Sequence, residues 1–209
     1  MESTDRTKIR ARAFLAGASI STIDFRGGPG AALGVYGVVH VPEGCVSIEA
    51  LADESAIETM AAALEIPRVP LPDALSGLAA FARGEPIDVA TVPVVLAGPP
   101  FYVKVWRALR DVHRGDVCTY AHLARATRSP RAMRAVGQAM AKNPLPLVVP
   151  CHRVIADHAK LGGYTGGTDR KRVLLALEGV EVDGDVVRPR QLDLAAWGLA
   201  ALDPARGAR

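Results

Sequence analysis

The sequence lacks both a long hydrophobic run and a regular set of cysteines. No stretch reaches the roughly 18 apolar residues that a membrane-spanning helix needs. Its three cysteines, Cys45, Cys118 and Cys151, are odd in number and far apart, which argues against a disulfide framework. The first twenty residues make a poor signal peptide, because acidic residues intrude and the apolar segment is short. We therefore expect a soluble, cytoplasmic protein without a membrane partner.

The sequence also has little net charge, only +3, but its charged residues are unevenly distributed. Residues 1–100 carry 7 basic and 12 acidic side chains, whereas residues 101–177 carry 14 basic and 4 acidic ones. A basic segment favours binding to a polyanion such as nucleic acid, because each neutralised phosphate releases counterions. A solvated basic surface explains the same distribution equally well, so charge alone leaves both interpretations open.

The order of the patterns predicts two domains with a boundary near residue 95. Residues 19–25 and 32–41 are rich in β-branched residues and are separated by the turn signal GGPG, which indicates two strands. Apolar residues at three and four spacing predict helices over 47–65 and 72–83. We expect residues 1–95 to form an α/β domain, a small antiparallel sheet with helices. Four prolines between residues 86 and 100 then predict an extended crossing.

Residues 96–209 are predicted to form a mainly α domain that contains a helix-turn-helix. A helix is expected over 101–115, closed by Gly115, and a short helix after the capping residue Thr119. Ser129 is the predicted N-cap of a further helix that runs to Asn143, with Pro130 at its first position. Residues 147–149 are expected to form a short buried strand, and the tail 189–209 a short helix packed on the body.

Two short helices joined by a tight turn are typical of DNA readers, although any α-rich domain contains such pairs. Basic residues Arg131 and Arg134 lie near the start of the second helix. Their small neighbours Ala132 and Ala135 would let the backbone approach a duplex closely. By itself this pattern is a weak indication of DNA binding.

The stretch VVPCHRVI places a thiol, an imidazole and a guanidinium in the middle of an apolar run. A free thiol ionises only slightly at neutral pH, so a nucleophilic Cys151 needs a base. His152 could accept its proton directly or through a water, and a carboxylate such as Glu178 could orient the resulting imidazolium. The alternative is simple packing, because cysteine is among the most buried residue types. A zinc site is a weaker alternative, because the neighbouring residues His113, Cys118 and His122 match no familiar ligand spacing.

The region from Phe101 through Gly179 resembles the O6-alkylguanine-DNA alkyltransferases, which repair alkylated guanine by moving the alkyl group onto their own cysteine. The resemblance is carried by separated blocks in the right order, which makes it highly specific. These blocks are Gly115-Asp116-Val117, Thr119-Tyr120, Arg134-Ala135-Val136-Gly137, Asn143-Pro144, Pro150-Cys151-His152-Arg153-Val154-Ile155, Gly163-Tyr164-Thr165-Gly166-Gly167 and Leu177-Glu178-Gly179.

The resemblance implies a catalytic role for four residues. Cys151 would attack the O6-alkyl carbon, with His152 as its base through a water and Glu178 holding the imidazole. Tyr120 would give a proton toward N3 of the guanine and would crowd the phosphate so that the nucleotide rotates. The thioether product cannot be released by water, so the protein would act once and remain alkylated.

The resemblance also implies a binding surface and a base pocket. Arg134 would enter the duplex through the minor groove and fill the space that the flipped base leaves. The pocket and its entry would be formed by Asn143, which organises the turn before the cysteine, by Pro146 as an apolar wall, and by Tyr164 and Thr165. The remaining DNA contacts would come from Ser129, Arg131, Ala132, Ala135 and Tyr120. The implied partner is duplex DNA containing O6-alkylguanine, bound by a monomer without a cofactor.

Three departures from the family pattern bear on these expectations. Arg128-Ser129-Pro130 stands where the family often has Gly-Asn-Pro, and residues 157–160 lack a usual glycine, which puts loop geometry in doubt. The first domain resembles the family's partner domain only loosely. Some relatives bind zinc there, but His40 and Cys45 alone cannot supply four ligands, so we expect no structural metal.

Two functions of other classes stay open. A non-catalytic lesion sensor would bind the alkylated base without repairing it, although the presence of Cys151 argues against it. A transcription regulator would use the helix-turn-helix and would need an additional effector or metal-binding module.

Overall fold

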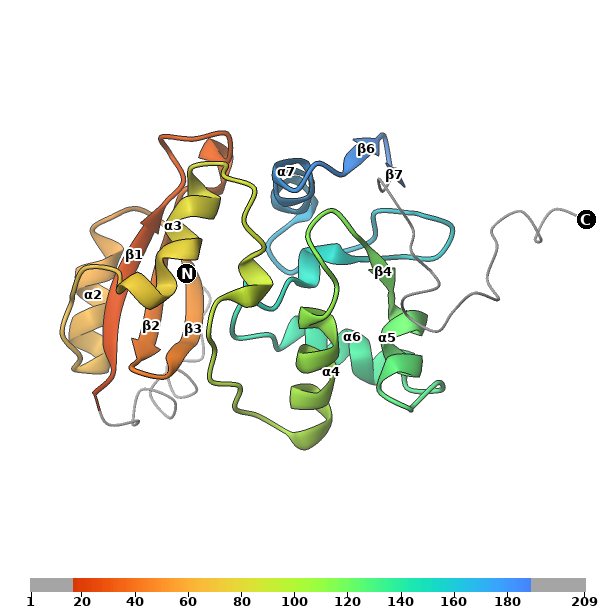
Figure 1. Cartoon of the computed structure of the whole chain (residues 1–209), viewed down its shortest axis with the longest axis horizontal. Coiled ribbons are helices and arrows are strands. Elements are labelled where there is room, and N and C mark those ends of the chain that lie inside the picture. The colour runs from red at the N-terminus through yellow and green to blue at the C-terminus, as the bar shows by residue number, and fades with distance from the viewer. Residues whose placement is uncertain (1–16, 189–209) are drawn as a thin grey trace, which may run out of the picture.

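The computed structural model of the chain describes residues 17–188, which form a small sheet with helices followed by a mainly helical half (Figure 1). The sheet has three antiparallel strands in the order β1 (Ser19–Asp24), β2 (Val35–Val41) and β3 (Gly44–Leu51). A single turn of 3-10 helix, η1 (Ala31–Leu33), lies between the first two strands. The predicted small antiparallel sheet is confirmed, because β2 pairs antiparallel with both β1 and β3. Every residue of β2, the central strand, is buried.

The helix predicted over 47–65 is wrong in its first half. Residues Gly44–Leu51 form β3, and the helix α2 begins only at Ala56 and ends at Leu64. The first five residues of β3 are all buried, so the strand shows no alternation that would distinguish it from a buried helix. Pairing with β2 decides the structure, since His40 lies opposite Cys45 and Val39 opposite Ser47.

Helices cover both faces of the sheet. One face packs Ile20, Val39 and Val46 against Ile57 and Ala61 of α2. The other face meets α3 (Ser76–Ala82), which follows a 3-10 turn, η2 (Asp73–Leu75). This second face also joins the core of the helical half, because one apolar cluster contains residues from both halves of the chain.

The edge of β3 is covered by two later segments. The extended stretch after α3, which includes the 3-10 turn η3 (Val89–Thr91), runs beside Cys45. Cys45 N donates to Pro93 O at 2.9 Å, and Val95 N donates to Cys45 O at 2.8 Å. Ile48 N donates to Pro144 O at 2.9 Å. The predicted extended crossing is confirmed, and these bonds attach the sheet directly to the turn that precedes Cys151.

The second half contains the helices α4 (Pro100–Arg110), α5 (Tyr120–Ala126), α6 (Met133–Ala141) and α7 (Thr168–Leu177). Between them, β4 (Cys118–Thr119) pairs in parallel with β5 (Val154–Ile155). A hairpin of β6 (Glu181–Asp183) and β7 (Val186–Arg188) follows α7. The helix-turn-helix expected in this half corresponds to α5 and α6, and Thr119 caps α5 as predicted, with its side chain accepting a hydrogen bond from His122 N.

Three local predictions for this half are wrong. Helix α4 ends at Arg110 and not at Gly115. Ser129 is not an N-cap: its carbonyl closes a turn with Ala132 N at 2.8 Å, and α6 begins at Met133. Residues 147–149 are fully buried but form a turn, in which Leu147 has a φ of 78°. Pro144 and Pro146 have no backbone N–H to donate to a neighbouring strand, which disfavours strand pairing here. The apolar residues at 147–149 are explained by the burial of this turn. The tail at 189–209 lies outside the described residues.

Candidate active site around Cys151

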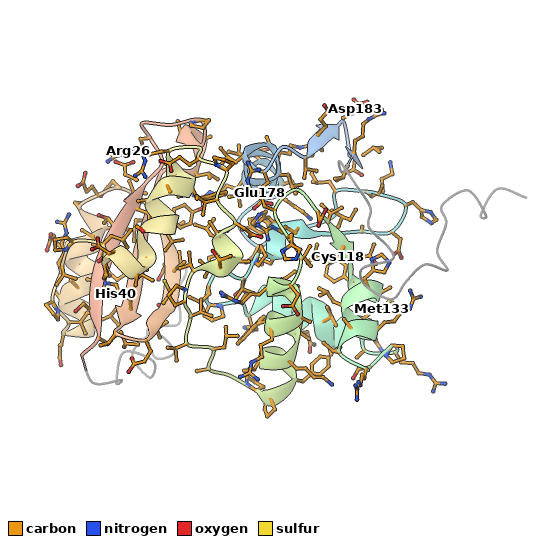
Figure 2. All side chains as sticks on the ribbon, viewed as in Figure 1. Arg26, His40, Cys118, Met133, Glu178 and Asp183 are labelled. Carbon is orange, nitrogen blue, oxygen red and sulfur yellow. The ribbon has the colours of Figure 1, made fainter. Side chains whose placement is uncertain are left out.

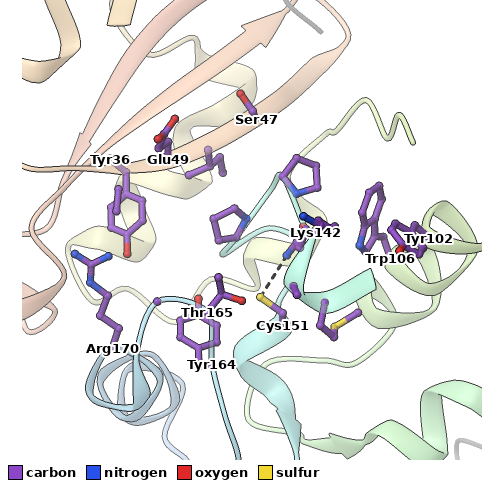
Figure 3. Close-up of a pocket in the computed structure, with 18 of the residues that line it drawn as sticks. Tyr36, Ser47, Glu49, Tyr102, Trp106, Lys142, Cys151, Tyr164, Thr165 and Arg170 are labelled. Atoms are coloured by element: carbon purple, nitrogen blue, oxygen red, sulfur yellow. Dashed lines mark hydrogen bonds between the residues drawn. The ribbon is translucent and has the colours of Figure 1, made fainter. Parts of the chain in front are cut away.

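Cys151 begins a single turn of 3-10 helix, η4 (Cys151–Arg153), that leads directly into β5. The turn before it is held by Asn143, whose Nδ2 donates to Val149 O at 2.8 Å and whose Oδ1 accepts from Leu145 N at 3.0 Å. The same Nδ2 lies 3.3 Å from the sulfur of Cys151 (Figure 3). The side chain of Asn143 therefore holds the turn before Cys151 in place and also contacts its sulfur.

The surroundings of the sulfur favour the neutral thiol. Burial raises the pKa of Cys151, and hydrogen bonds from Asn143 and Tyr164 lower it only in part. Cys45 and Cys118 are buried more completely, and burial raises the pKa of each to about 12. Cys151 is thus the one partly exposed cysteine, and it needs a base to become a nucleophile.

His152 and Glu178 form a fully buried pair behind the cysteine. His152 Nε2 lies 3.0 Å from Glu178 Oε1, and both side chains are 0% exposed. Burial alone would raise the pKa of Glu178, but His152, when it is protonated, and Arg153 lower it to about 2 through their charges and hydrogen bonds. Because an ionised carboxylate only accepts hydrogen bonds, Nε2 carries the proton. Nδ1 is then the free base nitrogen, and it has no hydrogen-bond partner in the protein.

Arg153 is the site residue that the sequence reasoning missed. Its guanidinium is fully buried and binds both oxygens of Glu178, at 2.9 Å from Nε and 2.7 Å from Nη2. Its other contacts are Val112 O and the carboxylate of Asp88, at 3.0 Å. A signal was present, because a charged residue within VVPCHRVI needs a buried counter-ion. The same stretch could not show that one partner stands 65 positions earlier in the chain.

Two cavities meet at Cys151. The smaller, of about 300 Å³, is lined by Tyr120 of α5, Gly137 of α6 and Tyr164 and Thr165 of the loop before α7. The larger, of about 590 Å³, lies between that loop, the N-terminus of α4 and strand β3 (Figure 3). Asn143, Pro146, Tyr164 and Thr165 line the larger cavity together with Cys151, so the structure brings all four predicted pocket residues to the cysteine.

The predicted DNA-contacting residues gather at the start of α6, on the side of the helical half away from the sheet. Arg131 and Arg134 are exposed, and Ser129, Ala132 and Ala135 are partly buried. Met133, which the sequence reasoning did not single out, is 47% exposed beside Arg134 (Figure 2). Gly137 lies one helical turn after Met133 and faces Tyr120. The helix therefore runs from an exposed basic end to the wall of the smaller cavity.

Within residues 17–188, no group of three or more His, Cys, Asp or Glu side chains could hold a metal ion, and no helix is long and apolar enough to cross a membrane. His122, one of the weak zinc candidates, instead completes the cap of α5, since its Nδ1 accepts from Thr119 N at 3.2 Å. Another candidate, His113, has a side chain that is 79% exposed.

Comparison with known proteins matches the region that contains this site. Residues 100–180 match the family model described as "6-O-methylguanine DNA methyltransferase, DNA binding domain". A methylated-DNA–protein-cysteine methyltransferase of Mycolicibacterium paratuberculosis is 45% identical over 105 residues, which are 50% of this chain and 63% of that protein. A protein of the same name from Mycobacterium tuberculosis strain H37Rv is 41% identical over 121 residues, 56% of this chain and 73% of that protein.

A similar fold is found in solved structures. The crystal structure of Mycobacterium tuberculosis OGT in complex with DNA is 33% identical, with a TM-score of 0.59, over 77% of this chain and 92% of that one. The O6-methylguanine methyltransferase of the same organism is 30% identical, with a TM-score of 0.62, over 86% and 99% of the two chains. The chain spans between half and two thirds of the length of the first curated relatives it matches, 53 to 63%.

Proposed function

Since the chain belongs to the methylated-DNA–protein-cysteine methyltransferase family, we propose that it repairs O6-alkylguanine in duplex DNA by transferring the alkyl group to its own Cys151. One observation carries the proposal. A partly exposed thiol opens onto two cavities beside a basic helix, and a buried imidazole with a free nitrogen is paired behind it with an ionised carboxylate. This combination supplies a nucleophile, a proton acceptor and space for a substrate.

The chemistry starts with the proton of the thiol. It passes from Cys151 to Nδ1 of His152 through one water, and Glu178 stabilises the imidazolium that forms. The thiolate attacks the alkyl carbon as the carbon–O6 bond breaks, and the electron pair goes to the guanine. The hydroxyl of Tyr120 gives its proton toward N3, and a proton returns to Tyr120 from the imidazolium through solvent. Burial raises the pKa of Tyr120, which keeps this hydroxyl protonated until then.

The alkylated base must leave the duplex to meet the sulfur, because no side chain can reach its alkyl carbon inside the stack. We propose that the base enters where the two cavities meet at Cys151, with Tyr120 and Gly137 on one side, Tyr164 and Thr165 on the other, and Pro146 and Asn143 on the wall of the larger cavity. Arg134 then fills the gap in the duplex from the minor groove. The further DNA contacts in this proposal are Arg131, Ser129, Ala132 and Ala135. Minor-groove binding reads little sequence, so repair should tolerate many sequence contexts.

The product is a thioether, which water does not cleave, so each chain acts once. We further propose that the protein works as a monomer, with residues 1–95 as a supporting domain and residues 96–209 as the domain that binds DNA and carries Cys151.

The direct test is to incubate the protein with a duplex that contains O6-methylguanine and to weigh the intact protein. The proposal predicts a gain of one methyl group on the Cys151 peptide. Cys151→Ala should gain no mass while still binding the lesion, and Cys45→Ala, a control at a buried thiol, should still be methylated. Tight lesion binding with unchanged mass would instead indicate a sensor, and binding only to one undamaged operator would indicate a regulator.

The DNA contact needs its own test, in which Arg134→Ala is compared with Arg107→Ala, a matched loss of an exposed arginine on α4. Arg134→Ala should slow transfer and weaken base flipping, measured with a fluorescent base beside the lesion, without lowering thermal stability. Arg107→Ala should behave as the natural protein. If the two substitutions have equal effects, Arg134 contributes only positive charge and does not enter the duplex as proposed.

A further inference from the structure

Behind the proposed active site, a single line of contacts reaches from His152 to the segment that joins the two halves of the chain. Glu178 Oε1 accepts from His152 Nε2 at 3.0 Å and from Arg153 Nη2 at 2.7 Å. The same Nη2 lies 3.0 Å from Oδ1 of Asp88, which directly precedes η3. Asp88 lies outside residues 100–180, the region that the family model covers.

When His152 carries a proton on both ring nitrogens, the charges of this cluster balance only with Asp88. Arg153 is positive, and Glu178 alone would neutralise it, so a proton on His152 would leave one uncompensated positive charge in a fully buried site. With Asp88 the resting cluster carries one excess negative charge, and protonation of His152 makes it neutral. Since an uncompensated buried charge is strongly disfavoured, the second carboxylate favours the imidazolium.

Asp88 is well placed for this role, because its carboxylate is itself held in position. Oδ1 also accepts from Ala90 N at 3.1 Å, and Oδ2 accepts from Arg114 N at 3.1 Å. Its side chain is only 20% exposed. Burial would raise the pKa of Asp88, but the charge of Arg153 and these hydrogen bonds lower it, so the carboxylate is ionised at neutral pH.

We propose that Asp88 is a positioning residue for the reaction of Cys151: through Arg153 and Glu178 it supplies the negative charge that lets His152 take the proton of the thiol. The inference rests on the proposed function, because it concerns the proton acceptor of that reaction. It also gives the connecting segment a chemical task, since the segment brings a charge to the site that residues 100–180 do not contain.

The other charged groups near the cluster set the limits of the effect. His113 Nδ1, on the loop after α4, is 3.6 Å from Asp88 Oδ2. Arg114 on that loop directs its guanidinium to Leu177 O at 2.6 Å. On the far side, Lys171 of α7 and Cys118 of β4 act electrostatically on each other, and Lys171 also acts on Cys151.

The test substitutes Asp88→Asn in the full chain, which removes the charge and keeps the shape. The rate of methyl transfer from an O6-methylguanine duplex is followed from about pH 6 to about pH 9. In parallel, the rate at which iodoacetamide alkylates Cys151 is followed without DNA and assigned by peptide mass. We expect both rates to fall about tenfold at neutral pH, because loss of one neighbouring charge changes proton affinity by about a factor of ten. Because burial raises the pKa of Cys151, the gap should narrow only at high pH, where the thiol ionises by itself, so the iodoacetamide assay is extended to about pH 11.

A merely structural role would not give this pH dependence. Asp88→Glu should restore much of the rate, and Glu85→Gln, which removes a surface carboxylate paired with Arg83 in the same segment, should change neither rate. Thermal unfolding shows whether Asp88→Asn is folded. If it is not, Asp88→Ser, which keeps an oxygen for Ala90 N, is measured instead. Unchanged rates at neutral pH, or a loss by the same factor at every pH, would overturn the proposal.

The two rates also separate the two proposals. If the natural protein takes no methyl group from DNA but Asp88→Asn still slows iodoacetamide at neutral pH, the proposed function fails and the role of Asp88 stands. If the natural protein is methylated and the variant equals it in both assays, the function stands and the role of Asp88 is refuted.

Discussion

Replacement of Glu178 by glutamine removes the carboxylate on which the buried cluster depends. Glu178 lies just after α7 and is 1% exposed, and it binds His152 and Arg153 at once. Glutamine keeps the shape and one acceptor oxygen, but its amide cannot neutralise a guanidinium. The substitution should therefore lower stability and, because His152 loses its partner, slow the reaction of Cys151 with alkylated DNA.

The size of the stability loss follows from the pKa of Glu178, which falls from an ordinary 4.5 to about 2 in the folded protein. At about 1.4 kcal/mol per pH unit, this corresponds to about 3 kcal/mol of stability at neutral pH. Because the folded pKa is the lower one, the contribution is complete above about pH 5 and is lost as pH falls from there toward pH 2. Loss of one partner of a buried ion pair costs a similar amount, about 3 to 5 kcal/mol.

Urea unfolding of the natural protein and of Glu178→Gln at several pH values measures this contribution. The difference in unfolding free energy should be about 3 kcal/mol at pH 7 and should shrink steadily toward about pH 2. Glu181→Gln, at an exposed carboxylate three positions later, is the control and should differ little from the natural protein. A difference below about 1 kcal/mol at pH 7, or one that does not change with pH, would refute the account of the cluster.

Three further outcomes are expected elsewhere in the site. Thr119→Ala removes the cap of α5 and should lower the unfolding free energy by about 1 kcal/mol in urea. Gly137→Leu fills the smaller cavity beside Tyr120, so it should abolish methyl transfer in the mass assay. Its unfolding free energy in urea should not fall, because leucine favours a helix more than glycine does. Asn143→Ala leaves Leu145 N and Val149 O without their partner, so it should lower the thermal midpoint by several degrees and slow transfer.

Much of the fold follows from local pattern in the sequence. Turn signals and β-branched runs predicted β1 and β2, the proline-rich stretch predicted the extended crossing, and Thr119 predicted the start of α5. Strand β3 was missed because it is buried on both sides at its start, and its pairing with β2 is a contact between segments. The turn at 147–149 was missed for a similar reason: its burial comes from packing, which an apolar run records without its geometry.

Some residues of the candidate site could likewise be predicted from the sequence, and others could not. Cys151 and His152 are adjacent in the sequence, and the chemistry of a thiol beside an imidazole could be inferred from that stretch alone. Glu178 was a candidate carboxylate, and the structure brings it to His152. The charge of Arg153 within an apolar run indicated a buried counter-ion, but the role of Asp88 could not be predicted, because it depends on a contact across 65 positions that arises only when the crossing segment packs on the helical half.

In the proposed reaction, Cys151 accepts one alkyl group and keeps it. The most direct test of this reaction is a titration in which a fixed amount of protein meets increasing excess of O6-methylguanine duplex, with methyl groups counted on each peptide by mass. We expect a plateau at one methyl group per chain, all of it on Cys151, and one repaired guanine for each chain. Repair that continues beyond one guanine per chain, or a methyl group on any other residue, would contradict it.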